Sequence, residues 1–406
     1  MMAWTRFNRN WSLVLGLMLS ASLWTNAQVY ISEQEAIDQS LHNYPLILSS
    51  LKKIEQQKAL LPSAYNFNNT ELQFQAPTGD GIRLSVLQIL DFPTVYLAQH
   101  KALKKQISVA EAEKETNVNL VKYTVKSTFN NLLFSLERER VLKRYDSILS
   151  DLIDVNEIRY RVGQIAILEK INGEAKYKII QNQLLQVQTE RRNNQFQLAL
   201  YLGKPGDSTY FPNSKFNKTA IPVAINFEDT VMEHNPILSL YKYQLDYSKM
   251  ALKVERNRQL PGLMLGYFNQ ASPAHAIPFD MRINYGITLP IAYWSYRAKI
   301  KSAKKAVEVS QNQSNLISNK LYSDFVQALS QYKQYSQSLS YFETIGIAQS
   351  KQIIENAQKS FRGGAISYYI YLQNLDQAFQ IDLNYLDALR NYNQSVINLL
   401  YIKGEL

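Results

Sequence analysis

Cysteine is absent from this chain of 406 residues, and glycine and proline are sparse, with 14 and 12 copies. The lack of cysteine excludes disulfides, thiolate metal sites, cysteine nucleophiles and a lipid anchor carried by an N-terminal cysteine. Few glycines and prolines indicate that little of the chain is disordered. Charged residues make up only 19%, with a net charge of +10. Because Lys and Arg are interspersed with Asp and Glu, this charge indicates a solvated helical surface rather than nucleic acid binding.

A long hydrophobic run is missing as well. The apolar segment at 12–21 is shorter than the ~20 residues that a membrane-spanning helix needs. It follows basic residues and precedes the small residue Ala27, an order typical of a secretory signal peptide. We therefore predict a signal peptide over 1–27, a mature chain beginning near Gln28, and export to the periplasm or outer membrane of a Gram-negative cell. A transmembrane anchor is the less favoured alternative.

An internal repeat organises what is present. The segments 160–166 and 361–367 both read aromatic-Arg-x-Gly-x-Ile-small, and they lie 201 positions apart. Gly203 and Gly404, which follow the next helical segments, have the same spacing. In each corner the glycine supplies a positive φ at which one helix ends and another begins. Two unrelated helix-turn-helix corners are the alternative, but they do not account for the shared register.

The repeat predicts one order of elements in two halves, 28–203 and 230–406, joined by an irregular connecting segment at 204–229. Each half begins with a helix, which in the first half covers 32–61 and is interrupted at Pro45. Alternation of apolar and polar side chains then predicts two strands in each half. A very long helix, the corner and a returning helix follow.

The very long helices dominate the chain. The stretch 94–160 contains neither proline nor glycine, and 296–361 contains only Gly346. At 1.5 Å per residue, one such helix is roughly 100 Å long. Apolar residues recur along both at steps of three and four, which predicts a coiled coil or a helical barrel rather than a compact domain.

The four predicted strands have the length needed to cross a bilayer when tilted. Four strands cannot close a barrel, and an open edge in lipid leaves backbone groups unpaired. Three copies would supply twelve strands. The expected fold is therefore mainly α with a small membrane β part: a long α-helical barrel plus a β-barrel completed by trimerisation, with a two-fold internal repeat and four strands per chain.

Several segments recur in the same order in both halves or at matching junctions. They are Asn43-Tyr44-Pro45, Asn235-Pro236, 285–291 with Arg297-Ala298, and 361–367 with Leu372-Gln373-Asn374. In these segments the chain resembles TolC-type outer membrane efflux proteins, over essentially all of its mature length. The segment 88–96 is similar to the branch that serves heavy-metal efflux pumps.

The resemblance implies a homotrimer in the cell outer membrane, with a periplasmic extension that docks to a membrane-fusion adaptor and an inner-membrane efflux transporter. It implies a passive exit duct that contacts outer membrane lipid. The corners would form the tip that meets the adaptor. The residues expected there are Arg161, Gly163, Arg362, Gly363 and Gly364.

The resemblance also implies a constriction near the second corner, where such channels carry acidic rings. This chain has Ile370 and Gln373 at those places, so we expect an apolar and aromatic closure that multivalent cations block weakly. Glu169, at the matching place in the first half, is a possible source of negative charge. The predicted constriction residues are Glu169, Tyr368, Ile370, Tyr371 and Gln373. A tyrosine cluster of this kind is more often simple packing.

No catalytic constellation, metal site or cofactor motif is found. The four histidines lie in different segments without metal-ligand spacing. Gly363-Gly364 is not a phosphate loop, because no Lys-Ser/Thr pair follows. We therefore expect no enzyme and no nucleic acid partner. The alternative to a channel is a structural periplasmic coiled-coil protein, which would have no reason to carry two hairpins at equivalent points.

Overall fold

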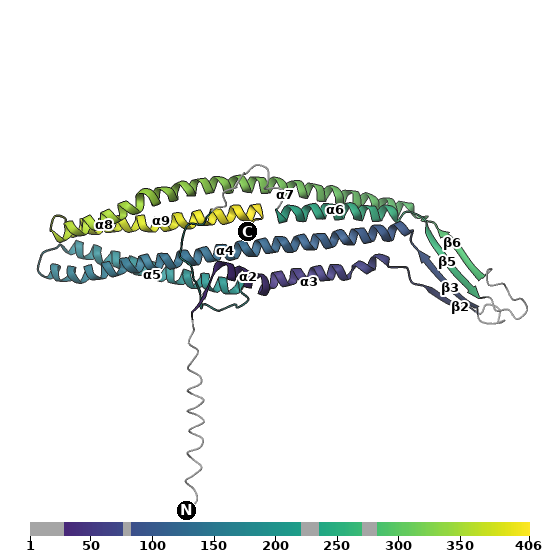
Figure 1. Ribbon diagram of the computed structural model, residues 1–406, viewed down its shortest axis with the longest axis horizontal. Helices are drawn as coiled ribbons and strands as arrows, with labels where there is room; N and C mark the ends of the chain where they lie inside the picture. Colours follow the sequence, from purple (N-terminus) through teal and green to yellow (C-terminus); the bar gives the residue numbers. More distant parts are fainter. Residues whose placement is uncertain (1–27, 76–82, 221–234, 270–281) are drawn as a thin grey trace, which may run out of the picture. The chain divides into compact units, whose positions relative to one another are not determined.

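The computed structural model describes residues 28–75, 83–220, 235–269 and 282–406. The predicted signal peptide, the turns of both hairpins and part of the connecting segment lie outside these ranges. The helices carry most of the described chain (Figure 1). They are α2 (Glu33–Asn43), α3 (Pro45–Ala59), α4 (Pro93–Arg161), α5 (Ile167–Tyr201), α6 (Pro236–Asn257), α7 (Tyr293–Tyr341), α8 (Ile347–Arg362) and α9 (Tyr368–Lys403).

The first predicted helix is divided in two. Ser32 and Glu35 form a capping box, in which the Ser32 backbone N–H donates to the Glu35 carboxylate at 2.8 Å and the Glu35 N–H donates to Ser32 Oγ at 3.2 Å. The chain leaves the helical conformation at Tyr44 and resumes with Pro45 as the first residue of α3. A short 3₁₀ helix, η1 (Leu61–Tyr65), follows α3.

The first very long helix is confirmed as α4, with 69 residues. The second is confirmed as an unbroken helical run over 296–361, but it is not α-helical throughout. A π-helical turn, η3 (Phe342–Gly346), separates α7 from α8. A β-carbon on Gly346 would lie 2.8 Å from the Phe342 ring, so the missing side chain at this position leaves room for that ring within the widened turn.

The predicted strands form one antiparallel sheet in the order β2-β3-β5-β6 (Figure 1). Its members are β2 (Glu71–Gln75), β3 (Arg83–Leu90), β5 (Gly262–Asn269) and β6 (Ile283–Thr288). Because β3 pairs with β5, the sheet joins one hairpin from each half of the sequence. The sheet is not closed within the chain.

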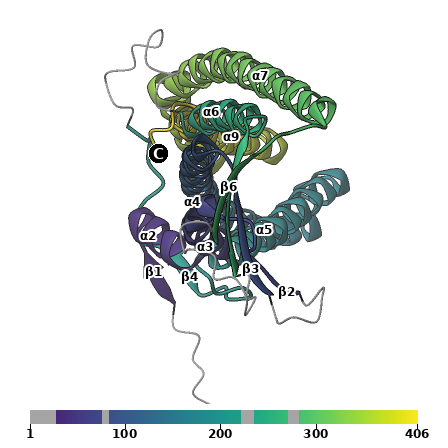
Figure 2. The same cartoon turned by 90° about the vertical axis from the view of Figure 1, so that its right-hand side faces the viewer.

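Two further strands were not predicted. The strands β1 (Val29–Ile31) and β4 (Tyr210–Pro212) pair in parallel (Figure 2), and the Gln195 side chain donates to the Tyr210 carbonyl at 3.0 Å. The connecting segment is therefore not irregular throughout. Strands of three residues are too short to show an alternating pattern, and Pro212 counts against a strand in any sequence-based reading.

The chain forms two compact units, and each draws residues from both halves of the sequence. Of the described residues, unit 1 contains those up to Ser40 together with 125–218 and 338–391, and unit 2 contains the others. In unit 1 the core joins α4, α5, α8 and α9 around Tyr145 and Phe379, whose rings stack with centroids 3.8 Å apart. In unit 2 smaller clusters pack Ala98 and Ala102 against Val254, and Phe325 against Leu399. The division of the sequence into the two repeats stays a prediction.

Candidate functional site

The two repeated corners have the same backbone hydrogen bonds in unit 1. In the first corner, Gln164 N–H donates to the Arg159 carbonyl at 2.8 Å. In the second, Ala365 N–H donates to the Ser360 carbonyl at 2.9 Å. The glycine before each donor has φ of 76° at Gly163 and 72° at Gly364. This is the Schellman ending of a helix, in which a left-handed residue lets the chain cap its own carbonyls.

The helices that follow the corners end in the same way. Gly203 and Gly404 have φ of 78° and 74°. Lys204 N–H donates to the Ala199 carbonyl, and Glu405 N–H donates to the Leu400 carbonyl, both at 2.9 Å. The spacing found in the sequence therefore recurs in backbone conformation at all four glycines.

The first corner carries a small ion-pair network. Arg161 Nε donates to the Glu157 carboxylate at 2.9 Å, and Lys170 Nζ lies 2.5 Å from its other oxygen. The ammonium group of Lys170 also lies 5.1 Å from the centroid of the Tyr160 ring. Hydrogen bonds from Lys170 and then Arg161 lower the pKa of Glu157, and the hydrogen bond to Glu157 raises the pKa of Lys170. These contacts tie the end of α4 to the start of α5.

An aromatic stack holds the second corner. Phe361, in the last turn of α8, stacks on Tyr371 of α9 with centroids 4.6 Å apart and planes 1° from parallel. The side chains of Tyr368 and Tyr371 are only 3% and 4% exposed. They belong to the core of unit 1 together with Leu372 and Leu375. The first turn of α9 is thus anchored by aromatic packing.

The predicted constriction residues differ in burial within the chain. The rings of Tyr368 and Tyr371 are enclosed by α4, α5, α8 and α9. The exposed side chains in the same turns are Tyr369, Ile370 and Gln373, while Glu169 is half-buried. The placement of Glu169, Tyr368, Ile370, Tyr371 and Gln373 at a constriction stays a prediction.

A buried polar contact lies beneath this turn. The Tyr368 hydroxyl lies beside the amide of Asn156, which is 2% exposed, and none of these polar atoms makes a hydrogen bond of good geometry. Burial raises the pKa of Tyr368 to about 12, and the Glu169 carboxylate acts in the same direction. A β-carbon on Gly173 of α5 would lie 2.5 Å from the hydroxyl oxygen. Gly173 therefore makes room for Tyr368.

The residue set predicted from sequence missed an ion pair beside Gln373. Lys176 of α5 and Asp376 of α9 form a salt bridge. Both line a shallow groove with Tyr369 and Gln373. Asp376 lies three positions after Gln373 and thus on a neighbouring position of the same helix. Continuing the search for acidic residues by one turn would have found it, but not its partner on another helix.

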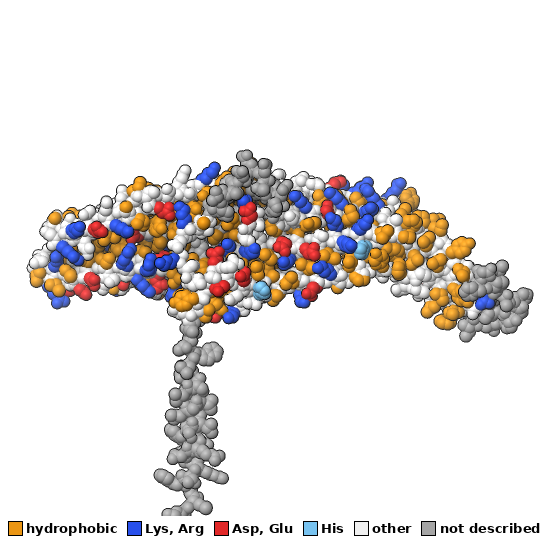
Figure 3. All heavy atoms as spheres, viewed as in Figure 1, with side chains coloured by type: hydrophobic (Ala, Val, Ile, Leu, Met, Phe, Trp, Pro, Cys, Tyr) orange, Lys and Arg blue, Asp and Glu red, His pale blue; other side chains and the backbone are white. Residues whose placement is uncertain are grey.

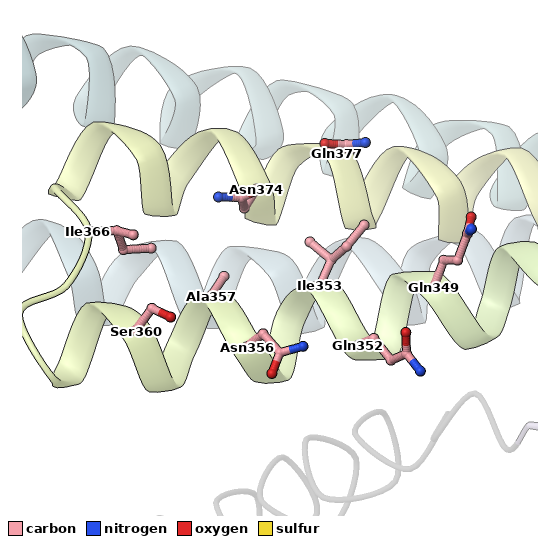
Figure 4. Close-up of a pocket in the computed structure, with 9 residues that line it drawn as sticks. All are labelled: Gln349, Gln352, Ile353, Asn356, Ala357, Ser360, Ile366, Asn374 and Gln377. Carbon is pink, nitrogen blue, oxygen red and sulfur yellow. The ribbon is translucent and has the colours of Figure 1, made fainter.

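A second groove runs between α8 and α9 (Figure 4), with a volume of about 520 Å³. Its lining holds no charged side chain. The lining residues are Gln349, Gln352, Ile353, Asn356, Ala357, Ser360, Ile366, Asn374 and Gln377. Amide and hydroxyl groups give this surface hydrogen-bonding capacity without attraction for either sign of charge.

Within the described ranges, no three His, Cys, Asp or Glu side chains gather closely enough to hold a metal ion. His100 lies against the Tyr65 ring with centroids 5.7 Å apart, and His234 and His275 fall outside the described residues. Among the described helices, none has both the length and the apolar character that crossing a membrane requires.

Comparison with protein-family models matches none of them, and comparison with the curated proteins finds no match. Solved structures do match. The CmeC outer membrane channel of Campylobacter jejuni has a TM-score of 0.76 at 16% identity, covering 95% of this chain and 90% of that one. The outer membrane protein VceC of Vibrio cholerae has a TM-score of 0.75 at 14% identity, covering 92% and 96%. The open-state MtrE outer membrane channel of Neisseria gonorrhoeae has a TM-score of 0.72 at 13% identity, covering 94% and 93%. This chain therefore has the fold of these outer membrane channels, as the resemblance to TolC-type proteins predicts.

Proposed function

We propose that the chain is the outer membrane exit duct of a tripartite efflux pump, which passively passes substrates delivered by an inner-membrane transporter and a periplasmic adaptor. The observation that carries the proposal is the four-stranded sheet of unit 2. It has one apolar face and two open edges, in a chain with the fold of outer membrane channels. In water, open sheet edges beside an exposed apolar face promote aggregation, so a water-soluble protein is not expected to carry such a sheet.

The two faces of the sheet differ in polarity. One row across all four strands contains Leu72, Val86, Tyr267 and Ile283. The next row on the same face includes Tyr285, which is 85% exposed. The opposite face carries Asn284, Gly286 and Thr288 on β6, together with Leu87 and Met264 on the central strands. An apolar outside and a more polar inside are what a membrane strand needs when it lines a water-filled lumen.

The open edges favour a homotrimer. In the described sheet, β2 and β6 each pair on one side only, which leaves backbone N–H and C=O groups without strand partners. In hydrocarbon each unpaired group costs several kcal/mol, so the edges of one copy would pair with those of the next. Three copies give twelve strands, an even number of the kind found in membrane barrels.

The corners of unit 1 are the proposed docking tip for the adaptor. Arg161 and Arg362 are exposed, and Gly163, Gly363 and Gly364 shape the turns beside them. The Schellman bonds use the corner carbonyls internally, so an adaptor would read mainly the exposed side chains. The localisation that goes with this proposal is the outer membrane, with the helices in the periplasm.

The test is expression in a Gram-negative host followed by membrane fractionation. A channel should partition into the outer membrane, run as a heat-labile trimer and conduct ions in planar bilayers. Recovery as a water-soluble monomer without conductance would instead support a structural coiled-coil protein.

Two neighbouring substitutions on β6 sharpen the test. Tyr285→Lys places a charge on the proposed lipid face, where it should cost about 2–4 kcal/mol near the midplane and reduce the yield of trimer. Asn284→Lys places the same charge on the other face and should leave assembly intact. Equal effects of the two variants would count against a membrane-spanning sheet.

A further inference from the structure

The first turns of α7 present aromatic and basic side chains on one face. Trp294 is 65% exposed and Tyr293 is 59% exposed, immediately after the sheet. Arg297, Lys301 and Lys304 follow at steps of four and three, and all three are exposed. Such steps bring side chains to the same side of a helix, so the five residues share one face. We call Tyr293, Trp294, Arg297, Lys301 and Lys304 the basic face of α7.

The charge of the basic face is not balanced locally. No Asp or Glu occurs between Ile283 and Val307. Within the described part of the chain, no carboxylate lies within salt-bridge distance of Lys301 or Lys304, whereas Lys305 pairs with Glu308 at 2.6 Å. Figure 3 shows Lys and Arg side chains gathered where α7 begins, beside the hydrophobic atoms of the sheet.

The order of side chains along the helix matches the layers of a membrane surface. Strand β6, with Ile283, Tyr285 and Ile287 on one face, comes first. The aromatic pair follows, with the Arg297 guanidinium 5.3 Å from the centroid of the Tyr293 ring, and then the lysines. Tyr and Trp favour the boundary between hydrocarbon and headgroups. Lys301 lies eight residues beyond Tyr293, or about 12 Å along the helix. If Tyr293 lies at the membrane surface, the charge of Lys301 is thus about one Debye length, about 8–10 Å, from that surface. The long lysine side chain can reach back and reduce this separation.

We propose that the basic face of α7 binds the phosphates of anionic phospholipids, in the membrane leaflet on the helical side of the bilayer. This inference rests on the proposed function, because it needs the sheet to be in a membrane. The phosphate of a phosphatidylglycerol-type headgroup would supply the anionic partner that Lys301 and Lys304 lack within the described chain. An acidic protein partner would bind the lysines but would not explain an exposed Tyr–Trp pair beyond a strand with an exposed apolar face.

The chain supplies its own reporter. The four tryptophans are Trp4, Trp11, Trp24 and Trp294, so Trp294 is the single tryptophan of the mature chain expected from Gln28 onward. The purified protein would be reconstituted in vesicles that contain brominated phosphatidylcholine or brominated phosphatidylglycerol as the quencher of tryptophan fluorescence. We expect phosphatidylglycerol to be enriched around Trp294, and the enrichment to weaken at high salt.

Matched variants test the role of the lysines. Lys301→Gln with Lys304→Gln should reduce the preference for phosphatidylglycerol by up to roughly fivefold per charge removed. Lys320→Gln with Lys333→Gln removes the same charge from exposed positions further along α7 and should leave the preference unchanged. Lys301→Arg with Lys304→Arg should retain it.

The possible outcomes separate this inference from the proposed function. If neither brominated lipid quenches Trp294, the sheet end is not at a membrane, and the proposed function fails together with the inference. If both lipids quench equally, or if the two double Gln variants behave alike, the protein is in the membrane but the basic face of α7 does not select anionic lipid. That result overturns the inference alone.

Discussion

The guanidinium of Arg159 lies over the ring of Phe361, with its carbon 5.0 Å from the ring centroid. Arg159 lies in the last turn of α4 beside the first corner, and Phe361 lies in the last turn of α8 beside the second. Because Phe361 also stacks on Tyr371, one continuous stack links three helices near the two corners. Corners that are far apart in sequence are thereby fixed to each other within unit 1.

We expect Arg159→Ala to weaken this link by about 0.5–1 kcal/mol, the usual size of a partly exposed cation–π contact. Urea unfolding of the single variants and of Arg159→Ala combined with Phe361→Leu would form a double-mutant cycle. A coupling free energy near zero would show that the Arg159 guanidinium and the Phe361 ring lie side by side without stabilising each other.

Adjacent glycines in the second corner should respond differently to alanine. Gly364 has φ of 72°, so Gly364→Ala should cost about 1–2 kcal/mol. Gly363 has φ of −78°, and a β-carbon there would lie 3.4 Å from the Lys359 carbonyl oxygen, so Gly363→Ala should be nearly neutral. The measurement is the shift in thermal unfolding of each variant.

Under the proposed function, Gly364→Val should lose adaptor binding. Normal export by this variant would mean that the corner is only a turn.

The effect of Gly173→Ala should depend on residue 368. With Tyr368 present, the new methyl group would lie 2.5 Å from the hydroxyl oxygen, and the variant should be less stable than the parent. In the Tyr368→Phe background the nearest ring carbon is 3.4 Å away, so the same change should stabilise α5 by about 0.5–1 kcal/mol through helix propensity. The measurement is the free energy of unfolding of the parent, the two single variants and the double variant. A destabilisation of the same size in both backgrounds would show that the hydroxyl is not the obstacle.

Acidification should loosen the first corner. The folded-state pKa of Glu157 lies below its ordinary 4.5, so its stabilising contribution is complete above that value and is lost as the pH falls through the lower folded pKa. The folded-state pKa of Lys170 lies above its ordinary 10.5. The stabilisation that Lys170 provides is therefore complete below pH 10.5 and is lost only as the pH rises through the higher folded pKa. Thermal unfolding of the parent and Glu157→Gln should differ at neutral pH and converge in acid. If the difference in unfolding temperature between the two proteins stayed constant across the acid range, the ion-pair network at Glu157 would not be the source of the stabilisation.

Cation block should depend on the ion pair beside Gln373. Lys176 neutralises Asp376, so under the proposed function we expect multivalent cations to block ion conduction weakly from the periplasmic side. Lys176→Met leaves the carboxylate uncompensated and should strengthen block, and adding Asp376→Asn should reverse the gain. Single-channel recording in planar bilayers is the measurement. Tight block of the parent that Glu169→Gln abolishes would show that Glu169, and not Asp376, controls the site.

The architecture was predictable because its signals are long or repeated. The absence of proline and glycine over 94–160 leaves α4 few alternatives to a helix, and the shared glycine spacing indicates matching corners before any coordinates are known. The hairpins were predictable from alternation alone. Local sequence does not determine how β3 of one half pairs with β5 of the other, because that pairing joins distant parts of the chain.

The site was less predictable, for two physical reasons. Which side of α9 faces the core depends on its neighbours, so Tyr368 and Tyr371 could not be distinguished from Tyr369 by residue type. Ion pairs between helices, such as Lys176 with Asp376, depend on helix register that no local pattern contains. The π-helical turn at Gly346 is a similar case, since a single glycine in a helical pattern is usually tolerated without a change of helix type.

The interleaving of the two compact units limits the order in which the chain can fold. The core of unit 1 joins Tyr145 to Phe379, and most of the sequence lies between their helices. A chain that emerges N-terminus first must therefore keep the apolar sides of α4 and α5 uncovered until α9 arrives. Contacts of such high sequence separation form slowly and leave intermediates prone to aggregation. A chain cut before Tyr368 should consequently be an insoluble fragment that depends on a holding chaperone, and not a smaller folded protein.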